Sequence, residues 1–143
     1  MSGHFVYTDI SFVNRWTVDS DGELVRFFGW ALAVRTKEGR LAMISQGVEA
    51  SADESTTRME TRAIEIARAV YPTATIISDC KSAKGYDLLA DKHDPFHQIV
   101  HYASRDALYT RLVTSGHSFK NRNKQAAIRF AHSMRSVEHE VLP

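Results

Sequence analysis

Three acidic residues of this sequence stand where apolar residues would be expected, and together they could bind metal ions. Glu60 lies in the apolar stripe of a stretch with helical spacing, which also contains Ala63 and Ala67. Asp9 interrupts an apolar, β-branched run, and Asp79 directly follows the run "TIIS". A buried carboxylate is costly unless it is paired or coordinates a metal. Carboxylates that lie close together repel one another unless a multivalent cation neutralises them.

The pattern of apolar and turn residues predicts the elements that must carry these carboxylates. Three strands would form an antiparallel meander, with the last two joined by the turn "KEGR". A long helix, capped by Ser51 with Glu54 as in a capping box, would run to about Val70. We expect strands at about 4–13, 24–36, 40–50, 74–78 and 107–114, and further helices at about 81–91, 95–104 and 121–135.

The run "ATIIS" is apolar throughout, which is typical of a strand buried on both faces of a parallel or mixed sheet. If this fourth strand lay beside the first, with the long helix packed across both, then Asp9, Glu60 and Asp79 would meet at one end of the sheet. The predicted fold is therefore one α/β domain over residues 1–143, with a five-stranded mixed sheet and helices on both faces.

Composition favours a cytoplasmic protein with no membrane partner. The only cysteine is Cys80, so neither a disulfide framework nor a cysteine-based zinc site is expected. The first residues contain no apolar run long enough for a signal peptide or a spanning helix. The formal net charge is +1, but between Ala107 and Val137 six basic residues occur without an acidic one. That run is either a solvated helix face or a surface that contacts phosphates.

Four short motifs resemble the type 1 enzymes of the ribonuclease H family, and the resemblance covers nearly the whole chain. Residues 56–60, "TTRME", stand where the family has Arg-Met-Glu at the start of its first long helix. Residues 8–11, "TDIS", match the family's "TDGS", and residues 78–80, "SDC", match its "TDS". Residues 115–117, "SGH", match its "KGH" loop. The resemblance implies a three-layer, ribonuclease H-like fold.

The resemblance also implies an activity, which is hydrolysis of the RNA strand of RNA–DNA hybrids with two Mg²⁺ ions, or with Mn²⁺. Asp9, Glu60 and Asp79 would hold the metals, and His117 would help to protonate or release the product. The partner would be nucleic acid, and the sequence does not reveal the oligomeric state. The residues implied in substrate binding are Ser11, Thr56, Thr57, Lys120, Arg122, Asn123 and Lys124.

The sequence departs from the family pattern at its terminal helix. There the family has an Asn followed four residues later by an Asp, which is the fourth metal-site carboxylate. Counting on from His117 and matching "NKQAA" both place the Asn at Asn123 and the Asp at Ala127. Thr56 and Thr57 also replace the paired Asn that reads the RNA 2′-hydroxyl. The family's glycine-rich loop after the first strand is replaced by a longer and bulkier one.

These departures leave two other functions open. The chain is then either a weak or inactive module that binds nucleic acid or protein, or a nuclease of the same fold that acts on branched or other DNA.

Histidine and tryptophan side chains are further candidates for a site. His93, His97 and His101 are four residues apart and would align on one helix face. Three ligands from one straight helix cannot close around one ion, so we expect a solvated or partly packed face. Trp16 in a loop is the better candidate for stacking on bases, whereas Trp30 is expected in the core.

Overall fold

Strand β1 (Phe5–Phe12) runs through the middle of a mixed sheet. In the computed structural model, which describes residues 3–114, β1 pairs antiparallel with β3 (Leu24–Arg35) and parallel with β5 (Thr75–Ser78). Strand β4 (Leu41–Ser51) pairs antiparallel with β3. The predicted meander and the predicted contact between the first strand and "TIIS" are therefore confirmed.

In the part of the chain that the structure describes, two short strands bring the sheet to six strands instead of the predicted five. Strand β2 (Thr17–Val18) lies in the loop after β1 and pairs antiparallel with the start of β3. Strand β6 (Leu88–Leu89) pairs parallel with β5 at the edge of the sheet.

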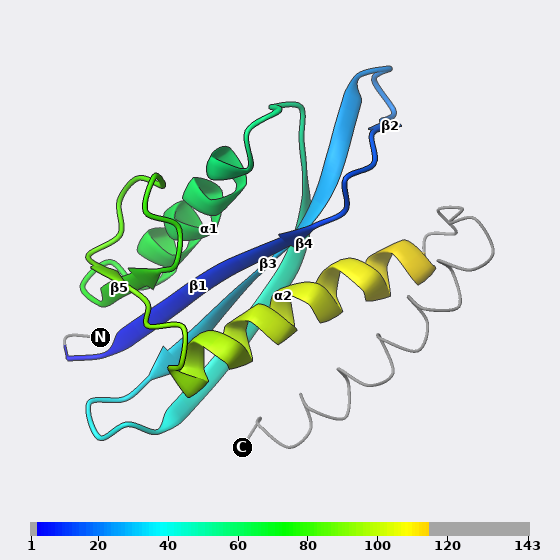
Figure 1. The fold of residues 1–143 in the computed structure, drawn as a ribbon. Helices are drawn as coiled ribbons and strands as arrows, with labels where there is room; N and C mark the ends of the chain where they lie inside the picture. Colours follow the sequence, from blue (N-terminus) through cyan, green and yellow to red (C-terminus); the bar gives the residue numbers. More distant parts are fainter. Residues whose placement is uncertain (1–2, 115–143) are drawn as a thin grey trace.

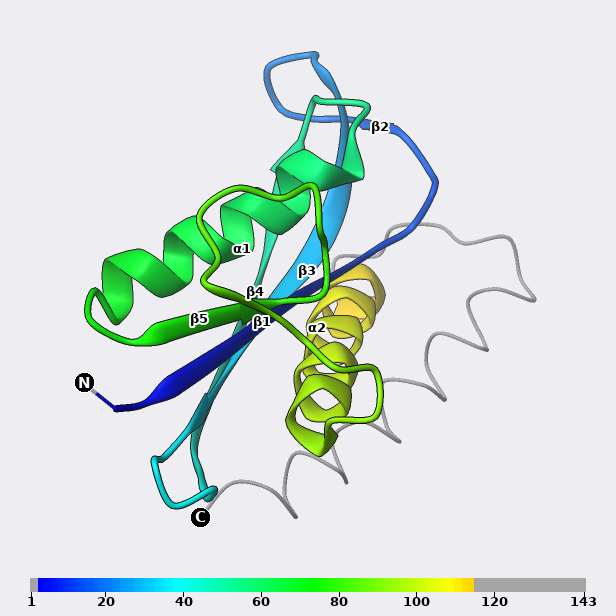
Figure 2. The same ribbon diagram turned by 60° about the vertical axis from the view of Figure 1, so that its left-hand side comes forward.

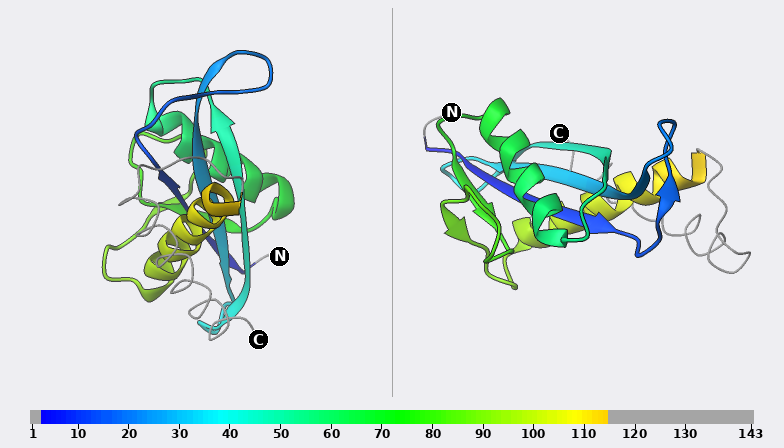
Figure 3. Two further views of the ribbon diagram at one scale, coloured as in Figure 1. Left: turned by 90° about the vertical axis from the view of Figure 1, so that its right-hand side faces the viewer. Right: turned by 90° about the horizontal axis from the view of Figure 1, so that it is seen from above.

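Within the described residues, one helix covers each face of the sheet, and helices on both faces were predicted. Helix α1 (Thr56–Val70) packs on β1, β3 and β5, and α2 (Pro95–Thr114) packs on β1, β3 and β4. Figure 1 and Figure 2 show the two helices on opposite sides of the strands, and the left view of Figure 3 shows the strands between them. The arrangement is an α/β fold of three layers.

The alternation of side chains along β1 divides the core between the two helices. Val6 and Ile10 face α1, while Tyr7, Asp9 and Ser11 face α2. The core on the α1 side includes Val6, Leu32, Val34, Ile64, Ala67 and Ile76, and the core on the α2 side includes Tyr7, Ala31, Ala33, Ile77 and Val100.

The predicted helix at 81–91 is wrong, because this segment forms turns and then β6. Gly85 adopts a φ of +94°, a left-handed conformation that a helix does not allow. The Asp87 carboxylate accepts a hydrogen bond from the Ile76 backbone N–H at 2.8 Å and pairs with Arg68 at 2.9 Å. These tertiary contacts hold the segment against β5.

The predicted strand at 107–114 is also wrong, because the helix that was expected at 95–104 continues to Thr114. Val100, Ser104, Leu108 and Leu112 are all buried and lie four residues apart, which is helical spacing. The β-branched run "ALYTRLVT" favours a strand locally, but its buried residues belong to the face of α2 that packs on the sheet.

Helix α1 begins later than predicted. Ser51 is the last residue of β4, where it pairs with Arg26, and Ser55 occupies the N-cap position without a side-chain capping bond. The Arg26 guanidinium donates hydrogen bonds to the carbonyl oxygens of Asp53 and Glu54, at 3.4 and 2.7 Å. These bonds hold 53–54 outside the helix, whereas the end at Val70 agrees with the prediction.

The helix expected at 121–135 lies outside the described residues. Within 3–114, neither helix combines the length and the apolar character that crossing a membrane requires.

Candidate metal centre

Asp9 and Asp79 occupy neighbouring positions just beyond the paired stretch of the parallel strands β1 and β5. Tyr7 pairs with Ile77, and the Thr8 hydroxyl donates a hydrogen bond to the Ile77 carbonyl oxygen at 3.3 Å. Asp9 follows Tyr7 by two residues, and Asp79 follows Ile77 by two residues. The two carboxylates therefore leave the same end of the β1–β5 pair, as the sequence predicted.

Glu60 joins them from α1, on the helix side that faces the sheet. Its side chain is buried, with 8 % of the residue exposed. Burial, the negative charges of Asp9 and Asp79, and a hydrogen bond with Asp9 raise the pKa of Glu60 from 4.5 to about 10. Burial and the charge of Asp9 also raise the pKa of Asp79, although His97 opposes this shift. The carboxylates thus influence one another as a cluster.

Helix α2 adds two imidazoles to this cluster. His97 Nε2 lies 3.7 Å from Asp79 Oδ2, and His101 Nδ1 lies 2.7 Å from Asp9 Oδ2. One ligand atom each from Asp9, Asp79 and His97 all lie within 4.8 Å of one another. These three residues could hold a metal ion.

Two buried atoms of the cluster have no hydrogen-bond partner among residues 3–114. They are Glu60 Oε2 and His97 Nδ1. Buried polar atoms are normally satisfied, so the unsatisfied Glu60 oxygen calls for an explanation such as an ion. His97 Nδ1 is not the ring nitrogen that lies beside Asp79, which is Nε2. A set of carboxylate and imidazole donors with free coordination capacity fits a divalent metal ion by its chemistry.

A glycine allows α2 to lie close to the sheet. A Cβ atom on Gly29 would come within 2.1 Å of the Ser104 carbonyl oxygen and 3.0 Å of Leu108 Cβ. Ser104 donates a hydrogen bond to the His101 carbonyl oxygen at 2.7 Å, so Ser11 is left to donate to the Ser104 hydroxyl at 2.8 Å. Ser11, which the resemblance places in substrate binding, is thus buried against α2.

The other residues that the resemblance assigns to substrate lie at the start of α1. Thr57 Oγ1 is 3.0 Å from the Ser82 hydroxyl, which links α1 to the loop after β5, and Thr56 is the first residue of the helix. Trp16 covers the Arg26 guanidinium at 4.7 Å from its ring, so this ring already has a partner. Trp30 packs against the core on the α1 side, as predicted.

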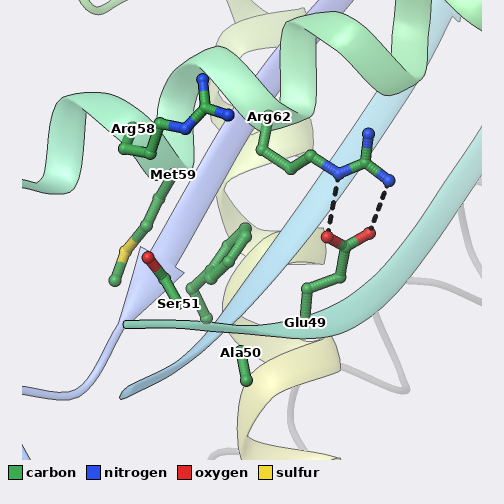
Figure 4. A pocket seen from close by; sticks show the side chains of 7 residues that line it. Glu49, Ala50, Ser51, Arg58, Met59 and Arg62 are labelled. Atoms are coloured by element: carbon green, nitrogen blue, oxygen red, sulfur yellow. Dashed lines mark hydrogen bonds and ion pairs between the residues drawn. The ribbon is translucent and has the colours of Figure 1, made fainter. Parts of the chain in front are cut away.

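A pocket of about 170 Å³ lies between the start of α1 and the end of β4, as shown in Figure 4. Arg58 and Arg62 lie two residues before and after Glu60, which places them on the other side of the helix. Arg62 makes two hydrogen bonds to the Glu49 carboxylate, at 2.9 and 3.3 Å. This pocket is separate from the carboxylate cluster. Its remaining lining residues are Phe28, Ala50, Ser51 and Met59.

Several predicted site residues lie outside the described part of the chain. They are His117, Lys120, Arg122, Asn123, Lys124 and Ala127.

Sequence reasoning missed the contacts that two histidines make with the carboxylates. A solvated or partly packed face describes the exposure of His97 and His101 but not their contacts with Asp79 and Asp9. The signal that points to them is the spacing of two histidines on one face of a helix that begins at Pro95.

Comparison of the chain with protein-family models, curated proteins and solved structures finds no match.

Proposed function

We propose that this chain is a divalent-metal-dependent nuclease of the ribonuclease H type. The observation that carries the proposal is the convergence of Asp9, Glu60, Asp79 and His97 from β1, the end of β5 and two helices. Three of these residues lie in the motifs on which the family resemblance rests. The adjacency of β1 and β5, with α1 packed on both, supports the arrangement that those motifs predict.

Asp9, Glu60, Asp79 and His97 would hold the metal, as Mg²⁺ or Mn²⁺. A bound divalent ion would supply Lewis-acid chemistry for in-line displacement at a phosphate, and the family resemblance implies two such ions. The nitrogen ligand favours Mn²⁺ over Mg²⁺, because Mg²⁺ prefers oxygen ligands.

His97 is the residue that we assign to the fourth ligand position. The sequence comparison placed that position at Ala127 on a terminal helix, because "NKQAA" resembles the family pattern. Helix α2 instead packs across β1 and brings His97 beside Asp79. A histidine there would complete the donor set without a fourth carboxylate.

The chain itself orients the ligands and controls their protons. Asp9 is held from both sides, because Oδ1 accepts the Ile10 backbone N–H at 2.9 Å and Oδ2 contacts His101. Glu60 carries a proton at neutral pH and must release it before it binds a cation. Asp79 and His101 are 38 % and 43 % exposed, so these two residues form the open rim where a substrate phosphate would approach.

The proposed substrate is an RNA–DNA hybrid, and this part of the proposal rests on the resemblance of "TTRME" and "TDIS" to the family motifs. Thr57 lies one turn before Glu60 on α1, and its hydroxyl, which already contacts Ser82, would also contact a sugar there. Branched DNA is the alternative substrate for the same chemistry.

The test is cleavage of a labelled RNA–DNA hybrid, beside double-stranded RNA, double-stranded DNA and a four-way junction, with Mg²⁺ and with Mn²⁺. Wild-type protein should cleave the hybrid only when a metal is added. Asp79→Asn and His97→Ala should lose this cleavage, whereas the exposed neighbours Asp91→Asn and His93→Ala should retain it.

Each outcome separates the candidate functions. Cleavage of the junction instead of the hybrid would change the substrate but keep the metal centre. Hybrid binding without cleavage in either metal would favour the binding module. Retained cleavage in Asp79→Asn would remove this cluster from the chemistry.

A further inference from the structure

Asp94, the residue before helix α2, caps the helix and also contacts strand β1. Asp94 occupies the N-cap position, where Oδ1 accepts the Phe96 backbone N–H at 2.9 Å and the carbonyl oxygen accepts Gln98 N–H at 3.2 Å. Pro95 follows at the first helical position, where the missing N–H costs nothing. The second carboxylate oxygen of Asp94 is thereby left to contact another element.

That oxygen accepts a hydrogen bond from Tyr7 on β1. The Tyr7 hydroxyl lies 2.5 Å from Asp94 Oδ2, and Arg35 on β3 donates to the same hydroxyl at 3.0 Å. The Tyr7 ring stacks on Phe96 with 5.6 Å between ring centroids. The first turn of α2 is therefore fastened to two strands of the sheet.

Tyr7 belongs to a row of polar contacts between β1 and α2. Alternate residues of a strand face the same side, so Tyr7, Asp9 and Ser11 all face α2. They contact Asp94, His101 and Ser104, respectively. The Asp9–His101 contact, which belongs to the metal centre, is the middle one of the three.

The row links the metal ligands through short stretches of rigid backbone. Asp9 is two residues from Tyr7 on β1, and His97 is one helical turn from Asp94 on α2. The contact between Tyr7 and Asp94 is the one in the row that lies nearest to His97 along α2, so it bears on the distance from the Asp9 carboxylate to the His97 imidazole. A small shift of the helix start would move His97 away from Asp79, from which it is 3.7 Å distant.

We propose that Tyr7 is a positioning residue of the metal centre, which acts through its hydrogen bond to Asp94 to place His97 for metal binding. This inference rests on the proposed function, because it needs a metal ion at the cluster. The hydroxyl is suited to a permanent contact, since burial and Asp94 raise the pKa of Tyr7 from 10.0 to about 12. It therefore stays a donor throughout the physiological pH range.

The test is Mn²⁺ binding by the full-length chain, measured by electron paramagnetic resonance of the free ion. Tyr7→Phe keeps the ring on Phe96 and removes only the hydroxyl. We expect Mn²⁺ affinity to fall about tenfold, which is the lower end of the loss found when outer partners of metal ligands are removed. Tyr71→Phe is the matched control, because within residues 3–114 the hydrogen bond of its hydroxyl is to the Met43 sulfur at 3.5 Å, away from α2. Its affinity should equal that of the wild type.

A second variant separates positioning from helix capping. Asp94→Ser keeps an N-cap side chain for Phe96 but offers no second oxygen to Tyr7. It should lose Mn²⁺ affinity to the same extent as Tyr7→Phe, and the double variant should lose no more than either. If Tyr7→Phe does not fold, Asp94→Ser alone decides the question.

A double-mutant cycle with His97 distinguishes this role from general destabilisation. If Tyr7 acts through His97, Tyr7→Phe should have no further effect on Mn²⁺ affinity in a His97→Ala background. Wild-type affinity in both Tyr7→Phe and Asp94→Ser would overturn the positioning role. Absence of Mn²⁺ binding by the wild type would instead overturn the proposed metal centre itself.

Discussion

The Asp9 carboxylate and the His101 imidazole lie 2.7 Å apart, and their contact joins strand β1 in the sheet to helix α2. Asp9 is buried, while His101 is partly exposed at the rim. The contact orients a carboxylate that also faces Glu60 and Asp79. Asp9 thus connects the His101 imidazole to the carboxylates, while His97 contacts the cluster through Asp79.

Asp79→Asn should abolish metal-dependent cleavage and leave the protein folded. The change removes a negative charge beside Asp9 and Glu60 but hardly alters packing, because the side chain is 38 % exposed. Mn²⁺ affinity should fall, and the melting temperature without metal should stay the same or rise, since repulsion is relieved. Circular dichroism and metal titration check this, with Asp91→Asn as the control. A variant that binds Mn²⁺ as tightly as the wild type would remove Asp79 from the ligand set.

Glu60 should make the metal-free protein less stable as the pH rises. Its folded-state pKa of about 10 lies above the ordinary value of 4.5, so the folded state binds more protons than the unfolded state between these values. Its stabilising contribution is then complete below about pH 4.5 and is lost progressively toward about pH 10. Melting temperatures measured in chelator from about pH 5 to about pH 9 should therefore fall.

Glu60→Gln should flatten this pH dependence, because the amide resembles the protonated acid and cannot ionise. Glu65→Gln, which changes an exposed carboxylate on the same helix, should retain the wild-type slope. Equal slopes in Glu60→Gln and the wild type would show that Glu60 is ionised in the metal-free protein.

Metal binding at neutral pH should release about one proton, because Glu60 must ionise to face a cation. Calorimetric titration with Mn²⁺ in two buffers of different ionisation enthalpy measures this release. Affinity should also increase with pH until Glu60 is ionised without metal. Glu60→Gln should bind Mn²⁺ more weakly and release fewer protons, and an unchanged proton count in that variant would assign the proton to another group.

The meander and α1 could be predicted from the sequence because short-range patterns determine them. Turn residues separate the first strands, and the apolar stripe of α1 has regular helical spacing. Asp9, Glu60 and Asp79 could be found because each one stands against such a pattern. A carboxylate in an apolar stripe can be recognised from the sequence without knowing which residues lie near it in the folded protein.

The segment after β5 could not be predicted in the same way, because distant contacts decide it. Asp87 is held by Ile76 and Arg68, so 81–91 does not form a helix. Helix α2 extends through the β-branched run near its end because Leu108 and Leu112 continue its buried face. His97 was missed for the same reason, since its partner Asp79 is distant in the sequence and comes near only when α2 packs on the sheet.

Gly29→Ala should destabilise the fold and weaken metal binding together. The new Cβ would lie 2.1 Å from the Ser104 carbonyl oxygen, so α2 must move away from β3. Such overpacking typically costs about 1–3 kcal/mol of unfolding free energy. Urea unfolding and Mn²⁺ titration measure the two effects. Gly39→Ala changes a turn glycine that has open space around it but a φ of +85°, so it should lose stability through backbone strain and leave Mn²⁺ affinity unchanged.

His97→Asp should change which metal the protein prefers. An aspartate at this position would give the site oxygen ligands only, which suit Mg²⁺, whereas the imidazole is better tolerated by Mn²⁺. We therefore expect wild-type cleavage to be weak in Mg²⁺ and clearly stronger in Mn²⁺, and His97→Asp to narrow this difference. The measurement is the concentration of each ion that gives half-maximal hybrid cleavage, with His93→Asp as the control for an added surface charge.

Ala127→Asp provides the opposing test, because it restores a carboxylate where the motif comparison places it. A lower Mg²⁺ requirement in Ala127→Asp, with no change in His97→Asp, would move the fourth ligand position from α2 to the terminal segment.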